Sequence, residues 1–156
     1  MQNASLDADR FEEACAAGRS RLADEPVAAV GSLRGALVLC RGPALVDVSE
    51  MPSILAARRR LEELRLVALE DCLEAELALG HHREVLVELQ ALTHEHPLRE
   101  RLWAHRMRAL FRSGRQPEAL RAFQDHRTML ADDVGLEPSA ALVELERQIV
   151  AGDPTV

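Results

Sequence analysis

The sequence predicts an all-α fold in which about seven helices form stacked hairpins and the last helix caps the stack. Three observations support this prediction. Aromatic residues make up only 3% of the 156 residues, while alanine, leucine, arginine and glutamate dominate, a composition that favours helices packed through aliphatic side chains over sheets. Apolar residues recur at the three- and four-residue spacings that place them on one side of a helix. Residues 64–127 repeat at a period of 34.

Two glycines set the register of this repeat. Gly80 and Gly114 lie 34 residues apart, and the positions around them agree in character. A period of 34 with a large apolar residue in a first helix, glycine at the turn and a small or apolar residue early in a second helix is the tetratricopeptide signature. One hairpin cannot bury both of its apolar faces, so neighbouring hairpins must stack. The equivalent pairs are Leu69 and Trp103, Glu84 and Glu118, Val85 and Ala119, Leu86 and Leu120, and Leu89 and Phe123.

The first part of the chain predicts a further, degenerate hairpin. Asp7 or Asp9 can cap a first helix that ends near Asp24, and Pro26 suits the first turn of a second helix. Val30, Leu33, Leu37 and Cys40 then recur on one face of that second helix. Arg41, Gly42 and Pro43 end it, and residues 44–52 predict a tucked loop, since apolar residues lie among its turn residues.

The remaining helices are predicted from the spacing of apolar residues and from the glycines and prolines that end helices. A final helix from Pro138 carries Leu142, Leu145 and Ile149 on one side and is expected to cover the exposed end of the stack. We expect residues 1–156 to form a single helical domain. The other predicted helices are a long one from Ser53 to Leu79, then Arg83 to His94, Leu98 to Arg112, and Pro117 up to Gly135.

The charge of the chain argues against direct contact with nucleic acid. The formal net charge is −7 and all 19 basic residues are arginine, so phosphate backbones are not attracted in general. The run Arg58, Arg59 and Arg60 is followed one turn later by Glu62 and Glu63, which favours a solvated helix face. No apolar run exceeds five residues, which predicts neither a signal peptide nor a membrane helix. We therefore expect a cytoplasmic protein.

Cysteines and histidines do not predict a metal site, a cofactor or catalysis. Cys15, Cys40 and Cys72 lie far apart in apolar helical stretches, which favours buried free thiols. The pair at His81 and His82 and the pair at His94 and His96 are separated by a helix of about 12 residues, or about 18 Å, far beyond a zinc ligand bond. No nucleophile with a base and no phosphate loop can be assembled from the spacings, so we expect no enzyme.

Several longer motifs carry a family resemblance over about nine tenths of the chain. From Phe11 to Val150 the sequence resembles the bacterial transcriptional activator domain of SARP-type and EmbR-like transcriptional regulators. Its one departure is Cys40, where that family commonly has tryptophan. The motifs are Arg41-Gly42-Pro43-Ala44-Leu45, Arg60-Leu61-Glu62-Glu63-Leu64-Arg65-Leu66, His96-Pro97-Leu98-Arg99-Glu100-Arg101-Leu102-Trp103, Gly114-Arg115-Gln116-Pro117-Glu118-Ala119-Leu120 and Gly135-Leu136-Glu137-Pro138.

The resemblance implies a partner-binding role. In such proteins the helical domain follows a winged helix-turn-helix domain that binds DNA, and it contacts that domain and RNA polymerase. The family residues here begin around position 6, which leaves no room for such a DNA-binding domain in this sequence. We therefore expect either a piece of a longer regulator or a free-standing relative that acts through other proteins.

The repeat pattern also nominates candidate partner-binding residues. In the helix from Leu98, four side chains fall within about 60° of one another and form a basic stripe, and two glutamates of the preceding long helix are expected to face the same groove. Pairing of the two stripes across helices is an alternative worth only about 0 to 1 kcal/mol per exposed pair. Trp103 is expected in the core. The candidates are Arg101, His105, Arg108, Arg112, Glu70 and Glu74.

Two functions fit these observations. The first is the protein-interaction domain of a bacterial transcriptional regulator, which docks to a DNA-binding domain and the transcription machinery without binding DNA itself. The second is a stand-alone tetratricopeptide-like adaptor for a peptide or protein outside transcription, for which the repeat alone is sufficient.

Overall fold

The described part of the chain is all α-helical. A computed structural model describes residues 2–39 and 52–156, and in these ranges it contains seven helices and no strand. This confirms the predicted all-α, tetratricopeptide-like fold. None of the described helices is long and apolar enough to cross a membrane. The helices are α1 (Gln2–Arg19), α2 (Pro26–Leu39), α3 (Pro52–Ala78), α4 (Leu86–Glu95), α5 (Glu100–Arg112), α6 (Gln116–Val134) and α7 (Ala140–Ala151).

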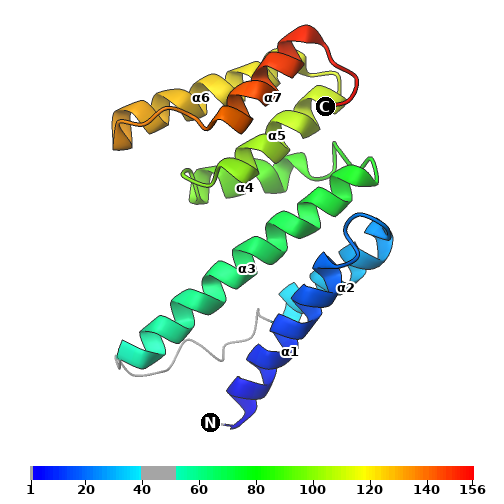
Figure 1. The fold of residues 1–156 in the computed structure, drawn as a ribbon, viewed down its shortest axis with the longest axis vertical. Coiled ribbons are helices and arrows are strands. Elements are labelled where there is room, and N and C mark those ends of the chain that lie inside the picture. Colours follow the sequence, from blue (N-terminus) through cyan, green and yellow to red (C-terminus); the bar gives the residue numbers. More distant parts are fainter. Residues whose placement is uncertain (1, 40–51) are drawn as a thin grey trace. The chain divides into compact units, whose positions relative to one another are not determined.

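The helices gather into two compact units (Figure 1). Unit 1 is Met1–Leu79 and holds α1, α2 and α3, whereas unit 2 is Gly80–Val156 and holds α4 to α7. Each unit has its own cluster of buried apolar side chains. The candidate partner residues are therefore divided, with Glu70 and Glu74 in unit 1 and the four basic residues in unit 2.

Unit 1 is a helical hairpin with a long helix packed against it. Helices α1 and α2 lie side by side, and α3 contacts both. Cys15 and Cys72 are buried in this core, as predicted, while Cys40, the Arg41–Leu45 motif and the loop that follows lie outside the described residues. The core is formed by Phe11, Cys15, Ala29, Leu33, Ala36, Leu37, Ala68, Cys72 and Ala75.

Ion pairs flank the core of unit 1. Arg19 Nε donates to Asp71 Oδ2 at 2.7 Å and joins the end of α1 to α3. Arg34 of α2 lies 3.3 Å from a carboxylate oxygen of Glu76. Arg58 donates to Glu62 at 3.1 Å, one turn along α3, which is the pairing expected for a solvated arginine run.

Unit 2 is built around α5. This helix contacts α4, α6 and α7, and α6 also contacts α7. The buried residues of α5 alternate with polar ones at helical spacing, so this one helix can pack against three neighbouring helices. The core is formed by Trp103, Met107, Leu110, Ala119, Ala122, Phe123, Leu142, Leu145, Ile149 and Val156.

The two glycines that set the sequence repeat share an unusual backbone conformation. Gly80 has φ of 86° and Gly114 has φ of 78°, in the left-handed region that glycine adopts without steric cost. Gly114 is followed by a hydrogen bond from Arg115 N to Leu110 O at 2.9 Å, which closes the turn between α5 and α6. The repeat register therefore reflects a backbone requirement.

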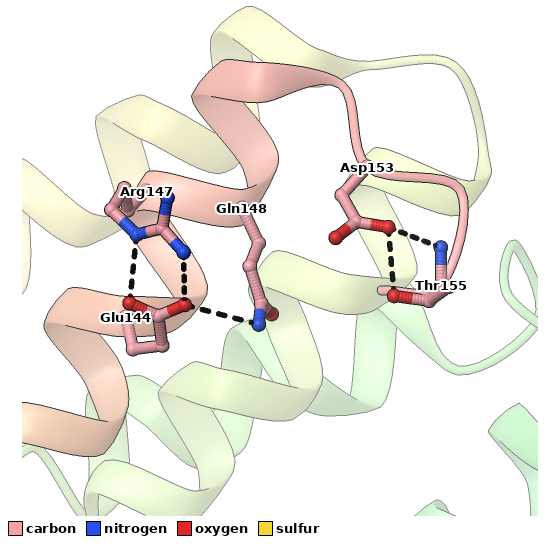
Figure 2. Close-up of polar contacts among 5 residues, drawn as sticks. All are labelled: Glu144, Arg147, Gln148, Asp153 and Thr155. Carbon is pink, nitrogen blue, oxygen red and sulfur yellow. Dashed lines mark hydrogen bonds and ion pairs between the residues drawn. The ribbon is translucent and has the colours of Figure 1, made fainter.

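Polar contacts hold α7 and the residues after it (Figure 2). Arg147 donates to both carboxylate oxygens of Glu144, at 2.8 and 2.6 Å, and Gln148 donates to the same carboxylate at 3.3 Å. The main-chain N–H and the hydroxyl of Thr155 donate to Asp153 at 2.8 and 2.7 Å. These bonds hold the pKa values of Glu144 and Asp153 below their ordinary ranges.

The predicted helix ends were wrong by one to several residues. The first helix begins at Gln2, so Asp7 and Asp9 lie inside it and not at its start; no glycine or proline precedes them to stop the helix. Residues 20–24 form a turn instead of continuing α1. Helix α4 begins at Leu86 and not at Arg83, because residues 82–85 also form a turn. Helix α7 begins after Ser139, whose hydroxyl accepts from Leu142 N.

Two glycines offer a matched test of the α1–α2 contact. A Cβ at Gly18 would lie 2.5 Å from Cγ of the buried Leu33, whereas a Cβ at Gly31 meets nothing within 4 Å. We expect Gly18→Ala to lower the free energy of unfolding by about 1 to 3 kcal/mol through overpacking. Gly31→Ala should raise it by about 0.5 to 1 kcal/mol, because alanine is the better helix former. Urea denaturation followed by circular dichroism measures both, and equal stability of the two variants would contradict the contact.

Candidate functional site

Trp103 of α5 contacts both the turn between α4 and α5 and one side of α6. Its side chain is 7% exposed, and its Nε1–H donates to the Pro97 carbonyl at 2.9 Å. The indole stacks on the ring of His126, with centroids 4.9 Å apart. The prediction that Trp103 is a core residue is confirmed.

Next to this stack, Glu100 contacts one residue of α6 and the N-cap residue of α7. His126 on α6 is 0% exposed, and its Nε2 lies 3.7 Å from Glu100 Oε1 at the start of α5. Burial lowers the pKa of His126, while Glu100 acts in the opposite direction. Glu100 Oε1 also accepts from Ser139 N at 2.8 Å, just before α7. Burial raises the pKa of Glu100, but the hydrogen bonds from Ser139 and the proximity of His126 outweigh it and hold the pKa below its ordinary value.

A groove of about 300 Å³ lies between α5 and α7, and we call it the α5–α7 groove. Arg101 and Arg108 contribute its basic side from α5, and Leu142 and Leu145 contribute an apolar side from α7. Such a groove can hold an apolar side chain with a carboxylate beside it. Its lining residues are Glu100, Arg101, Ala104, Arg108, Ser139, Ala141, Leu142 and Leu145.

The other predicted partner residues lie elsewhere. His105 is 2% exposed, so its ring lies in the interior and not on the exposed stripe. Arg112 donates from Nε to the main-chain oxygen of Val156, outside the α5–α7 groove. Glu70 of unit 1 is 3% exposed, and Glu74 is exposed. The structure thus brings together Arg101 and Arg108 of the six candidates, and their role as a partner site stays a prediction.

A second groove lies on another side of α5, between α4 and α6, and we call it the α4–α6 groove. It consists of two hollows of about 220 and 470 Å³ that share Gln90 and Arg106. Arg106 lies over the Trp103 ring, 5.5 Å from its centroid. This groove was not among the sites predicted from the sequence, where its one local signal is Arg106, a basic residue three positions after a core tryptophan.

The histidine pairs show no arrangement for metal ligation. Among the described residues, no three side chains of His, Cys, Asp or Glu come together in a way that could hold a metal ion. Burial and the charge of Arg112 lower the pKa of His82, which is the environment of a turn histidine next to a cation.

Comparison with known proteins places the chain in a family. The model of the family described as "Bacterial transcriptional activator domain" matches residues 6–150. The chain belongs to this family. The resemblance that the motifs indicated is therefore confirmed, and the family is one of transcriptional regulators.

Curated relatives are regulators of greater length. The regulatory protein DnrI of Streptomyces peucetius is 44% identical over 149 residues, which cover 96% of this chain and 53% of that protein. The regulatory protein AfsR of Streptomyces coelicolor is 43% identical, and the match covers 100% of this chain and 16% of that protein. EmbR of Mycobacterium tuberculosis is 38% identical over 90% of this chain and 35% of its own length. The chain spans about half or less of the length of these relatives.

A solved structure has the same fold. The structure described as Mycobacterium tuberculosis EmbR in complex with low affinity phosphopeptide matches with a TM-score of 0.89 at 36% sequence identity. The match covers 95% of this chain and 39% of that chain.

In this transcriptional activator domain the family motifs of unit 2 begin at turns and junctions between helices. The His96–Trp103 motif contains both Pro97, which accepts from the Trp103 indole, and Glu100, which accepts from Ser139. The motif that starts at Gly114 begins in the turn between α5 and α6 and continues into the first turns of α6. These motifs therefore fix how α5 is held in unit 2.

Replacing Trp103 tests how much its burial contributes to the stability of the fold. We expect Trp103→Ala to lower the free energy of unfolding by about 3 to 5 kcal/mol, because a large buried side chain is lost. Trp103→Phe keeps a ring against His126 but loses the hydrogen bond to Pro97, so it should cost only about 1 kcal/mol from that bond, plus the lost packing volume. Chemical denaturation of both variants measures the difference. Wild-type stability of Trp103→Ala would show that the residue is not core.

Proposed function

We propose that this chain is the protein-interaction domain of a bacterial transcriptional regulator. It docks onto a DNA-binding domain and onto the transcription machinery, with RNA polymerase as the candidate partner there, and it acts in the cytoplasm without binding DNA or catalysing a reaction. The observation that carries the proposal is the family match over residues 6–150. It is supported by relatives that are regulators and that are longer than this chain.

The charges of the chain support an interaction with protein. The net charge is −7, and arginines on α1, α2, α3 and α6 are neutralised by carboxylates at 2.7 to 3.3 Å. A DNA contact needs several arginines that neutralise phosphates together. The EmbR structure was solved with a phosphopeptide, which supports the idea that regulators of this group bind segments of other proteins.

The α5–α7 groove is the proposed docking site. Arg101 and Arg108 supply positive charge, while Leu142 and Leu145 supply apolar surface on the same groove. A partner segment with a carboxylate and an apolar side chain would match it, since interfaces combine an apolar centre with charge complementarity. The wider set that includes His105, Arg112, Glu70 and Glu74 stays a prediction.

A tethering experiment tests the function. The chain is fused to an unrelated DNA-binding protein whose site lies upstream of a weak promoter, and transcript from that promoter is measured. We expect transcript to rise several-fold over the DNA-binding protein alone, because the domain recruits the transcription machinery. Purified chain should also be retained by RNA polymerase holoenzyme from the same organism. Failure of both measurements with a folded fusion would contradict the proposal and favour an adaptor outside transcription.

Charge reversal tests the groove. We expect the double variant Arg101→Glu and Arg108→Glu to bind the retained partner at least about tenfold more weakly, or about 1.4 kcal/mol, because two groove cations become anions. Circular dichroism and melting temperature should change little. The matched control is Arg127→Glu with Arg147→Glu, which reverses the same charge on exposed residues outside the groove. Equal loss in both double variants would reject the groove as the docking site.

A further inference from the structure

The α4–α6 groove has a polar half and an apolar half that meet at Arg106. The polar half, about 220 Å³, lies beside Arg115, Glu118, Arg121 and Asp125. The apolar half, about 470 Å³, is bounded by Pro97, Trp103 and Met129. Arg106 and Gln90 line both halves. A ligand that occupies the whole groove must therefore offer a polar group beside an apolar one.

Arg106 is held in place by neutral groups. Its Nη1 donates to Thr93 Oγ1 at 3.1 Å, and that hydroxyl donates to the Leu89 carbonyl at 2.9 Å. The guanidinium carbon lies 5.5 Å from the centroid of the Trp103 ring. Within the described residues, no carboxylate lies within ion-pair distance of Arg106. The groove thus presents a fixed guanidinium with N–H donors left for a ligand.

The surroundings favour an anion at this position. Burial lowers the pKa of Arg106, because a partly buried cation is poorly solvated, and the charge of Asp125 opposes this only in part. Arg115 is already bound to Glu118 through contacts of 2.7 and 2.5 Å. The polar half therefore keeps a local excess of positive charge, with Arg106 and Arg121 against Asp125, in a chain whose net charge is −7.

The apolar half offers a contact for a large hydrophobic side chain. Trp103, Pro97 and Met129 line it. On α4, Val87 is 80% exposed, and at 100° per residue it falls on the same face as Gln90 and His94. Methionine and aromatic side chains of this kind are typical of surfaces that receive apolar residues of a partner.

We propose that the α4–α6 groove binds an acidic, apolar segment of a partner protein, with a carboxylate on Arg106 and an adjacent large apolar side chain against Trp103 and Met129. A carboxylate and a guanidinium match in geometry and can form two parallel hydrogen bonds. This surface is distinct from the α5–α7 groove, and the inference does not rest on the function proposed for that groove.

A protein segment fits the groove better than nucleic acid. Binding to a phosphate backbone draws on several arginines or lysines at once, whereas this groove offers Arg106 and Arg121 together with Asp125 in its polar half, next to an apolar half. Its apolar half has no counterpart in a duplex backbone. A single carboxylate next to an apolar side chain uses both halves.

Peptide selection on the intact chain tests the proposal. A random peptide library is selected on immobilised wild-type protein, and one recovered peptide is synthesised together with an analogue in which Asp and Glu are replaced by Asn and Gln. Binding is followed by the emission of Trp103, the single tryptophan of the chain. We expect recovered peptides to pair Asp or Glu with a large apolar residue, and the analogue to bind at least about tenfold more weakly. Recovery of no such peptides would overturn the proposal.

Substitutions in the chain test whether Arg106 binds the carboxylate of the peptide. Arg106→Met should remove the preference for the acidic peptide over its analogue, while the matched exposed control Arg127→Met should retain it. Should Arg106→Met fail to fold, the two peptides are compared on the double variant Arg101→Glu and Arg108→Glu, where a retained preference for the acidic peptide points to the α4–α6 groove. Equal binding of both peptides, an unchanged Trp103 emission, or an equal response to a random DNA duplex would overturn the proposal. Arg101→Glu with Arg108→Glu should leave this peptide binding unchanged, which separates it from the α5–α7 groove.

Discussion

The structure of unit 2 depends on the burial of α5 against three neighbouring helices. Trp103 is the centre of that burial, because its indole N–H is satisfied by Pro97 and its ring stacks on His126. Burial of a large aromatic side chain contributes several kilocalories per mole only when its polar group finds a partner. Glu100 extends the same arrangement to the start of α7 through Ser139. The fixed position of α5 then determines what its remaining faces can present.

The position of α5 between its neighbours creates two grooves, one on each of two sides of this helix. Arg101 and Arg108 emerge toward α7, and Arg106 emerges between α4 and α6. Each groove combines arginine with apolar surface, which suits protein segments that carry carboxylates and agrees with a chain that carries net negative charge overall. The transcriptional activator domain thus has two separate grooves along one helix, and each is a docking surface only under the proposals made above.

Much of this architecture could be predicted from the sequence, because it is encoded locally. The glycines of the repeat require a left-handed backbone, and the large residue at position 103 follows the tetratricopeptide pattern into the core. The candidate site is harder to predict from the sequence than the fold. A helical wheel gives the direction of a side chain but not its depth, so His105 was grouped with Arg101 and Arg108 although its ring is buried. Contacts such as that of Glu100 with Ser139, which are 39 residues apart, carry no local signal.

Native-state hydrogen exchange of the intact chain tests most directly whether unit 2 is organised by α5. The amides of Met107 and Ala109, whose side chains are fully buried, should exchange only through openings that also expose the core of α6, with a free energy equal to that for unfolding of unit 2. The amides of α4, whose outer face is exposed, should open at lower cost. Exchange of the α5 amides through a local opening, while α6 and α7 stay protected, would contradict this account.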